Sequence, residues 1–172
     1  MTTISHALFL GGRSGVGKSS VGAEIHAQLS AAEVRHCLIE GDNLDQAWPA
    51  PWEQGHQLAE ANLAAMWANY RALGYRRMIY TNTASVRVVP ALTAAMGDNP
   101  QVTAVLLTAT DNTARRRLGR REIGSAYEWH VSRSDRAARE LEVAAPPWVH
   151  RIATDDRPVT EIAAEIITLT GW

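Results

Sequence analysis

This 172-residue sequence has little cysteine, almost no net charge and no long hydrophobic run. Cys37 is the only cysteine, so no disulfide can form within the chain, and its apolar neighbours favour a buried side chain. The net charge of −1 argues against an extended surface for nucleic acid or membrane. No apolar run approaches the roughly 20 residues that a membrane-spanning helix needs.

The N-terminus, the composition and the length indicate the class of protein and the number of domains. Residues 1–6 lack the positive charge and the long apolar stretch of a secretory signal peptide, so we expect a cytoplasmic protein. Hydrophobic residues make up 46% of the chain and charged residues 20%, which are ordinary values for a globular protein. The length predicts a single domain over residues 1–172, and the sequence leaves monomer and homodimer open.

Glycine is concentrated where the sequence is most informative, in residues 12–19. These residues match G-x-x-x-x-G-K-[ST], the phosphate-binding P-loop, between an apolar run and a helical pattern. Backbone N–H groups of the loop and the following helix N-terminus would hold a phosphate. Lys18 would reach the β- and γ-phosphates as a catalytic residue, and Ser19 would ligate Mg²⁺. The predicted nucleotide-binding residues of this segment are Gly12, Arg13, Ser14, Gly15, Val16, Gly17, Lys18, Ser19 and Ser20.

Short apolar runs alternate with helical patterns along the chain. Strands are predicted over residues 6–10, 35–40, 77–80, 102–107 and 148–153, and helices over 18–30, 56–73, 88–96, 132–143 and 159–169. A further helix is predicted to begin near an Asp111 cap. This alternation predicts an α/β fold with a parallel sheet covered by helices on both faces. Ligands of such folds bind beyond the carboxyl ends of the strands.

Asp42 follows the second predicted strand and is the leading candidate for a catalytic base. A carboxylate there would accept the proton of a substrate hydroxyl aimed at the γ-phosphate. Glu40, two residues earlier, would lie on the same side of the chain and act on Mg²⁺-bound water. The alternative is that Asp42 only forms a turn or a helix cap.

Arginines gather after the fourth predicted strand. Arg117 and Arg121 are one helical turn apart and are predicted to bind the nucleotide, with Arg121 stabilising the charge that moves in the reaction. Arg133, followed by Arg136 and Arg139, is a further candidate for substrate binding. A lid over about residues 119–135 would carry these side chains over the triphosphate. The alternative is a solvated basic helix face with acidic neighbours.

Three side chains are candidates for binding the phosphoryl acceptor. Trp48 and Trp52 lie in a proline-containing stretch after Asp42 and would line an acceptor site, or else pack into the core. Asn82 follows the third strand and would orient an acceptor, or else form a local turn. That strand has no acidic residue at its end, which argues against a motor-type ATPase.

The loop before the last predicted helix is a candidate for holding the adenine ring. Asp156, Arg157 and Pro158 would do so through backbone contacts. Alternatively, Asp155 or Asp156 only caps the helix.

Together these segments resemble the small P-loop kinases of the nucleoside-monophosphate-kinase type, above all adenylylsulfate kinase and chloramphenicol phosphotransferase. The resemblance covers nearly the whole chain in order, and its closest part is Gly41-Asp42-Asn43. It implies a three-layer P-loop fold with a five-stranded parallel sheet in the order 2-3-1-4-5 and a small helical lid. It also implies Asp42 as the base, Arg117 over the adenine and Arg121 at the phosphates. Thr81-Asn82-Thr83-Ala84 departs from the corresponding adenylylsulfate kinase segment, so no acceptor is implied.

The sequence therefore predicts a small-molecule kinase that uses ATP and Mg²⁺. It would move the γ-phosphoryl group to a hydroxyl of a metabolite or an antibiotic. One alternative is a nucleotide or nucleic-acid-end kinase. Another is an ATP-binding switch or ATPase that has no phosphoryl acceptor.

Overall fold

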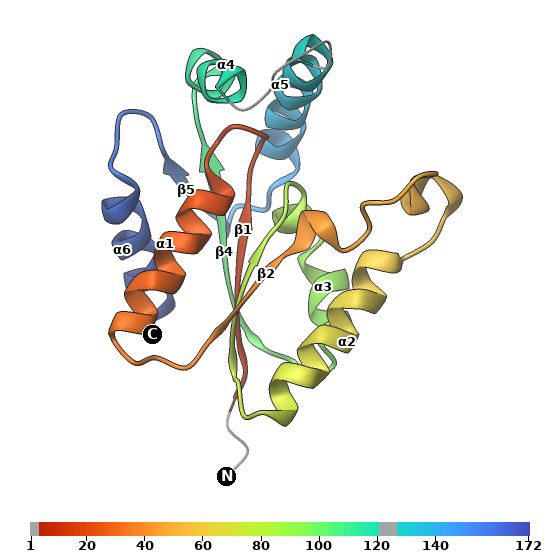
Figure 1. Ribbon diagram of the computed structural model, residues 1–172, viewed down its shortest axis with the longest axis vertical. Helices are drawn as coiled ribbons and strands as arrows, with labels where there is room; N and C mark the ends of the chain where they lie inside the picture. Colours follow the sequence, from red (N-terminus) through yellow and green to blue (C-terminus); the bar gives the residue numbers. More distant parts are fainter. Residues whose placement is uncertain (1–3, 121–126) are drawn as a thin grey trace.

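The fold is built on a parallel sheet of five strands (Figure 1), in a computed structural model that describes residues 4–120 and 127–172. The strands are β1 (His6–Gly11), β2 (Cys37–Glu40), β3 (Arg77–Thr81), β4 (Gln101–Thr108) and β5 (His150–Ala153). Their order is β2-β3-β1-β4-β5, and every neighbouring pair is parallel. This confirms the predicted sheet and its order.

Helices cover both faces of this sheet, as predicted. The α-helices are α1 (Lys18–Ala31), α2 (Leu58–Ala72), α3 (Val89–Met96), α4 (Asp111–Gly119), α5 (Tyr127–Ala144) and α6 (Val159–Thr170). Short 3-10 helices lie at η1 (Gly41–Asn43), η2 (Pro51–Gln54) and η3 (Ser85–Arg87). Helices α1 and α6 pack together on one face, and α2 and α3 pack together on the other (Figure 1).

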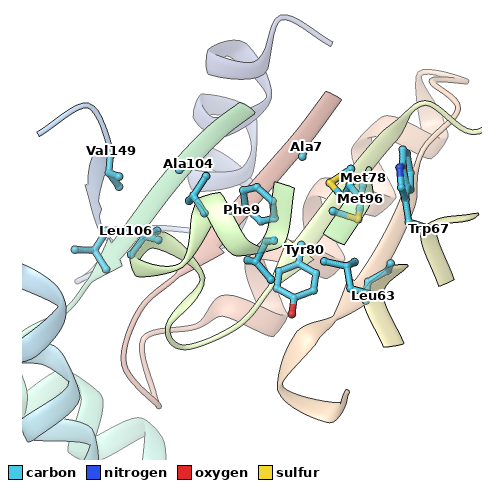
Figure 2. Close-up of a cluster of buried hydrophobic side chains, with 14 of the residues drawn as sticks. Ala7, Phe9, Leu63, Trp67, Met78, Tyr80, Met96, Ala104, Leu106 and Val149 are labelled. Atoms are coloured by element: carbon cyan, nitrogen blue, oxygen red, sulfur yellow. The ribbon is translucent and has the colours of Figure 1, made fainter. Parts of the chain in front are cut away.

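Alternation along β1 divides the core into two layers. Ala7 and Phe9 join the cluster under α2 and α3, whereas Leu8 and Leu10 join the cluster under α1 and α6. Figure 2 shows the first cluster, in which Phe9 meets the Tyr80 ring edge-on at 5.8 Å between centroids. Side chains of this size each contribute about 1.5–3 kcal/mol when they are fully buried.

Trp67 and Trp148 differ in burial. Trp67 of α2 is fully buried in the first cluster (Figure 2), and its Nε1 donates to Asp98 at 3.2 Å. Trp148, which was expected at the start of a strand, is 52% exposed, because β5 begins only at His150.

Three local predictions are wrong. Helix α5 begins at Tyr127 rather than at residue 132. Thr110, not Asp111, caps α4, since the Thr113 N–H donates to Thr110 Oγ1 at 3.3 Å. Helix α6 has Pro158 at its N-cap and no side-chain cap, so neither Asp155 nor Asp156 caps it.

Candidate active site

The loop between β1 and α1 curves tightly at three glycines. The φ angles of Gly12, Gly15 and Gly17 are +144°, +82° and +107°, in the region that side chains strongly disfavour. A Cβ atom on Gly12 would lie 2.7 Å from the Leu107 carbonyl oxygen, and one on Gly15 would lie 2.7 Å from that of Ala114. The backbone therefore needs glycine here both for its conformation and for its close packing against β4 and α4.

Lys18 is buried at the start of α1 and closes this loop. Its Nζ donates to the carbonyl oxygens of Gly12 at 2.8 Å and Arg13 at 3.2 Å. The ammonium group thus lies against the residues that begin the loop, beside the backbone that curves around the predicted phosphate position.

Ser19 lies beside a carboxylate that comes from β2. The Ser19 hydroxyl donates to Glu40 Oε2 at 3.2 Å, and the hydroxyl of the buried Thr81 donates to the same oxygen at 2.8 Å. Strand β3 has no acidic residue at its carboxyl end. The carboxylate beside Ser19 comes instead from Glu40 of the neighbouring strand β2. Hydroxyl and carboxylate oxygens suit Mg²⁺, which proteins usually bind together with phosphates and waters. No group of three or more His, Cys, Asp or Glu side chains among the described residues could hold a metal alone.

Asp42 lies in η1, immediately beyond Glu40, and contacts the end of β3. Its Oδ1 accepts from Asn82 Nδ2 at 3.0 Å and from the Thr83 N–H at 3.1 Å. Asn82 also forms the turn expected as its alternative role, because its Oδ1 accepts from the Ala84 N–H at 2.8 Å. The structure therefore brings Asp42 and Asn82 together and holds the exposed Asp42 carboxylate in one orientation.

A cavity of about 310 Å³ lies beside the P-loop, at the lower end of the range for small-molecule sites. Arg117 forms part of its wall and is held by hydrogen bonds of 2.9 Å to the Val16 carbonyl oxygen and to both the hydroxyl and the carbonyl of Thr154. The cavity is lined by Gly15, Val16, Gly17, Ser20, Val21, Arg117, Arg120, Thr154, Arg157, Val159 and Ile162. Of the predicted adenine loop, Arg157 lines the cavity, whereas Asp156 and Pro158 do not.

Asp155 fastens this loop to the start of α4. Its carboxylate accepts from the Thr110 N–H at 3.0 Å and from the Thr110 hydroxyl at 2.8 Å. Burial acts to raise the pKa of Asp155, but hydrogen bonds from Thr113 and Thr110 and the charge of Arg117 outweigh it and lower that pKa.

Arg13 belongs to the P-loop, but its side chain points away from the phosphate position. It is 2% exposed, donates to Ser134 Oγ at 2.9 Å, and forms ion pairs with Asp111 of α4 and Asp135 of α5. Arg115 pairs with the other oxygen of Asp135 at 2.5 Å. We call Arg13, Asp111, Arg115, Ser134 and Asp135 the loop clamp.

The loop clamp fixes the base of the region expected to act as a lid. Ser134 Oγ donates to the Ser14 carbonyl oxygen at 2.8 Å, so α5 is bonded to the P-loop backbone as well. Desolvation acts to raise the pKa of Asp135, but hydrogen bonds and charge from Arg115 and Arg13 outweigh it and lower that pKa. Sequence reasoning missed this network because Arg13 is separated from its partners by 98 to 122 residues.

A second, larger hollow of about 1040 Å³ lies between the loop after β2 and helix α5. Both flank the carboxyl end of the sheet (Figure 1). Trp48 is 91% exposed and Trp52 is 50% exposed, so neither is a core residue. The hollow is lined by Ala47, Trp48, Ala50, Trp52, Glu53, Thr83, Arg87, Ser132, Arg133, Arg136, Ala137, Arg139 and Glu140, and we call it the acceptor cleft.

The acceptor cleft adjoins Asp42 through Thr83, which lines the cleft and donates its N–H to the Asp42 carboxylate. Trp48, Trp52 and Arg133 thus come together around one hollow, and their role in substrate binding stays a prediction. Arg121 and residues 121–126 of the predicted lid lie outside the described residues.

Comparisons with solved structures identify the fold. The chain is similar to the tunicamycin resistance protein of Deinococcus radiodurans, with a TM-score of 0.64 and 19% identity over 97% of this chain and 96% of that one. It is similar to a gluconokinase from Sinorhizobium meliloti, with a TM-score of 0.62 and 18% identity over 98% and 95% of the two chains. It is also similar to the APS kinase of Mycobacterium tuberculosis, with a TM-score of 0.60 and 18% identity over 98% and 99%.

These neighbours share the small P-loop kinase fold, which confirms the fold that the resemblance implied. No protein-family model matches the sequence, and no curated protein is similar to it in sequence. Within the part of the chain that the structure describes, no helix is both long and apolar enough to cross a membrane.

Proposed function

We propose that this protein is a phosphotransferase that moves the γ-phosphoryl group of ATP to a hydroxyl of a small molecule. The observation that carries the proposal is the position of Asp42, whose carboxylate is oriented by Asn82 and Thr83 next to the Ser19–Glu40 pair. A P-loop alone indicates only nucleotide binding. A fixed carboxylate beside a separate cleft supports a second substrate, whose hydroxyl would receive the phosphoryl group of that nucleotide.

The donor would bind with its base in the cavity beside Arg117 and its phosphates in the P-loop. Backbone N–H groups and Lys18 would surround the β- and γ-phosphates and stabilise the charge that spreads over the oxygens during transfer. Ser19 would ligate Mg²⁺, which neutralises phosphate charge when bound, and Glu40 would accept a hydrogen bond from a water of its shell.

The acceptor would bind in the acceptor cleft with its hydroxyl at Asp42. The Asp42 carboxylate accepts the hydroxyl proton as that oxygen forms a bond to the γ-phosphorus and the bond to the ADP oxygen breaks. Most of the acceleration comes from holding the two reactants in line in a preorganised field.

Incubation with γ-labelled ATP and a metabolite extract, followed by mass spectrometry of labelled products, tests this proposal. We expect label in one phosphorylated organic product with the wild type and with Arg116→Ala, a control at an exposed position. Label that appears only in inorganic phosphate would favour an ATPase or switch and contradict the proposal.

A nucleotide kinase is the second candidate, because arginines line the acceptor cleft and would suit a phosphate group. Calorimetric titration of a mononucleotide into protein saturated with a non-hydrolysable ATP analogue separates the two. Binding at one further site, followed by transfer of label to that nucleotide, would establish this narrower function.

A further inference from the structure

The acidic residues beside Asp42 point to a class of acceptor, an inference that rests on the proposed function and deepens it. We propose that the phosphoryl acceptor is an amino alcohol. Asp45 and Glu60 hold its protonated amine while its hydroxyl faces Asp42. The Tyr80 hydroxyl accepts a further hydrogen bond from the ammonium group.

Charge is segregated in the segment that includes β2, the loop after it and α2. Residues 36–70 contain no lysine and no arginine, although the whole chain has 17 basic and 18 acidic residues. The acidic residues of this segment are Glu40, Asp42, Asp45, Glu53 and Glu60. This side of the site therefore presents negative charge without a basic side chain of its own.

Three of these carboxylates come together beside η1, and we call them the acidic corner: Asp42, Asp45 and Glu60. The η1 turn places the first two together, because the Leu44 N–H donates to the Gly41 carbonyl at 3.1 Å and side chains three residues apart then share one side. Asn62 Nδ2 donates to the Leu44 carbonyl at 2.6 Å. This bond brings the first turn of α2, which contains Glu60, against the same segment.

No described residue forms an ion pair with the acidic corner. Burial and the negative charges of Glu60 and Asp42 raise the pKa of Asp45, against a hydrogen bond from its own backbone N–H. Among the described residues, no group of three or more such side chains could hold a metal ion. An organic ammonium group, with three N–H donors and a positive charge, would complement these carboxylates.

The Tyr80 hydroxyl is a second observation that points to a ligand at this position. Tyr80 is 1% exposed, and Figure 2 shows its hydroxyl pointing away from Phe9 at the edge of the cluster. A Cβ atom on Gly41 would lie only 2.5 Å from the Tyr80 Oη, so the hydroxyl lies directly against η1. None of the described residues forms a hydrogen bond with it. Buried polar groups usually have such a partner, and an ammonium group would supply one.

Burial and the charges of the acidic corner raise the pKa of Tyr80, so its hydroxyl keeps its proton. The oxygen is then an acceptor for an ammonium N–H, while its own proton is available to a carboxylate. The site therefore offers hydrogen-bond acceptors from two carboxylates and one hydroxyl to a single cation.

The amine and the reacting hydroxyl belong to one molecule because Asp42 is part of both arrangements. Ala47 and Trp48, which follow Asp45 by two and three residues, line the acceptor cleft, so the rest of the acceptor extends into that cleft. A protonated amine has no lone pair with which to attack phosphorus. Binding it as an ammonium ion therefore directs the phosphoryl group to the hydroxyl oxygen.

Fractionation of the metabolite extract tests this inference. A cation exchanger at about pH 2 retains amines, including those that carry a carboxyl group, because carboxylates are then protonated. Each neutralised fraction is incubated with the protein, Mg²⁺ and γ-labelled ATP, and we expect a labelled organic product only from the retained fraction. Treatment of that fraction with acetic anhydride in water, which acylates amines and leaves alcohols, should abolish the product.

Variants of the acidic corner locate the amine. Asp45→Asn and Glu60→Gln should each raise by about tenfold the amount of retained fraction needed for half-maximal transfer, with unchanged affinity for an ATP analogue. Tyr80→Phe should raise it about threefold. Glu161→Gln, at an exposed acidic position on α6, is the matched control and should behave as the wild type.

Thermal melting separates recognition from a structural role. Asp45→Asn and Glu60→Gln relieve repulsion, and Tyr80→Phe breaks no hydrogen bond to a described residue, so none should melt below the wild type. Lower melting temperatures that account for the weaker transfer would contradict the assignment.

A product formed from the unretained fraction, a product that survives acylation, or transfer to a mononucleotide would overturn the inference. Wild-type dependence on the retained fraction in both Asp45→Asn and Glu60→Gln would overturn the role of the acidic corner. Release of inorganic phosphate alone from both fractions would instead count against the proposed function.

Discussion

The proposed donor side of the sheet edge, formed by the P-loop and its cavity, and the proposed acceptor side, formed by the acceptor cleft, are built in opposite ways. On the donor side, glycines and backbone carbonyls set the shape, and Arg13 is 2% exposed inside an ion network. On the acceptor side, the walls are exposed side chains, with Trp48 91% exposed. The shape of the P-loop is therefore set by packed backbone, whereas the acceptor cleft is lined mostly by exposed side chains.

This difference explains how one fold can serve different acceptors. Changes at the P-loop disturb close packing, since a Cβ on Gly12 or Gly15 would collide with the backbone of β4 or α4. Changes at Trp52 or Arg139 remove only exposed groups. Function then depends on the site that a fold carries and not on the fold itself.

Of the changes at the proposed donor site, Lys18→Ala is expected to have the largest effect. Loss of the ammonium group removes charge stabilisation from the moving phosphoryl group, which typically costs about 10²–10³-fold in rate. ADP formation in the presence of the metabolite extract measures this loss, with Arg116→Ala, at an exposed position, as the control. A rate within a few-fold of the wild type would show that the P-loop does not bind the donor phosphates as proposed.

Arg13→Ala tests whether the donor side is a buried network. The substitution leaves Asp135 buried with one partner fewer, and breaking a buried ion pair in this way typically costs about 3–5 kcal/mol in the free energy of unfolding. Urea unfolding measures the loss. The control, Glu142→Gln, breaks the exposed pair with Arg151 and should cost less than about 1 kcal/mol. Equal losses in the two variants would contradict the conclusion that Arg13 stabilises the protein through a buried ion network.

Arg117→Ala should weaken nucleotide binding more than it weakens folding. The guanidinium ties Val16 to Thr154 and forms part of the cavity wall, so we expect affinity for an ATP analogue to fall about tenfold, or 1.4 kcal/mol. Arg116→Ala is the matched control, since Arg116 is exposed on the same helix and does not line the cavity. Calorimetry measures the two affinities for the ATP analogue. Equal affinities for the two variants would show that Arg117 does not contribute to nucleotide binding.

The smallest expected effect is a pH dependence of stability, and it arises from a histidine outside both proposed sites. His36 lies before β2, where its Nδ1 donates to the Val34 carbonyl oxygen at 2.6 Å and its Nε2 accepts from His26 Nδ1 at 2.8 Å. Burial lowers the pKa of His36 below its ordinary value of 6.5. The unfolded chain therefore binds more protons than the folded one just below pH 6.5, and stability falls as the pH drops through this range.

Urea unfolding at about pH 7.5 and 5.5 measures this dependence, since the two values bracket an ordinary histidine pKa. His36→Gln should flatten it, whereas His150→Gln, at an exposed position, should not. An unchanged dependence in His36→Gln would assign the effect to another group.

The sequence was most informative where chemistry is local. The P-loop pattern between an apolar run and a helical period predicted β1, the loop and α1, because adjacent residues alone determine that geometry. Asp42 and Asn82 are both predicted as site residues because each follows a strand, and the carboxyl ends of parallel strands meet at one edge of the sheet. The structure places the two side chains in hydrogen-bond contact.

The rest depends on contacts between distant segments. Nothing near Arg13 in the sequence indicates that its side chain would bind α4 and α5 and not face a phosphate, since its partners are about a hundred residues away. The Asp111 cap predicted for α4 is wrong for the same reason, because Asp111 pairs with the distant Arg13 and the adjacent Thr110 caps the helix.

The central claim is that a donor site and a separate acceptor site meet at Asp42, and Asp42→Asn tests it most directly. The amide keeps the shape of the carboxylate but cannot take a proton, so transfer of label to the organic product should fall by about 10²–10⁴-fold. Affinity for the ATP analogue, measured on the same sample, should stay within about twofold, since Asp42 lies outside the P-loop. Undiminished transfer by Asp42→Asn, or equal loss of transfer and nucleotide affinity, would contradict the account.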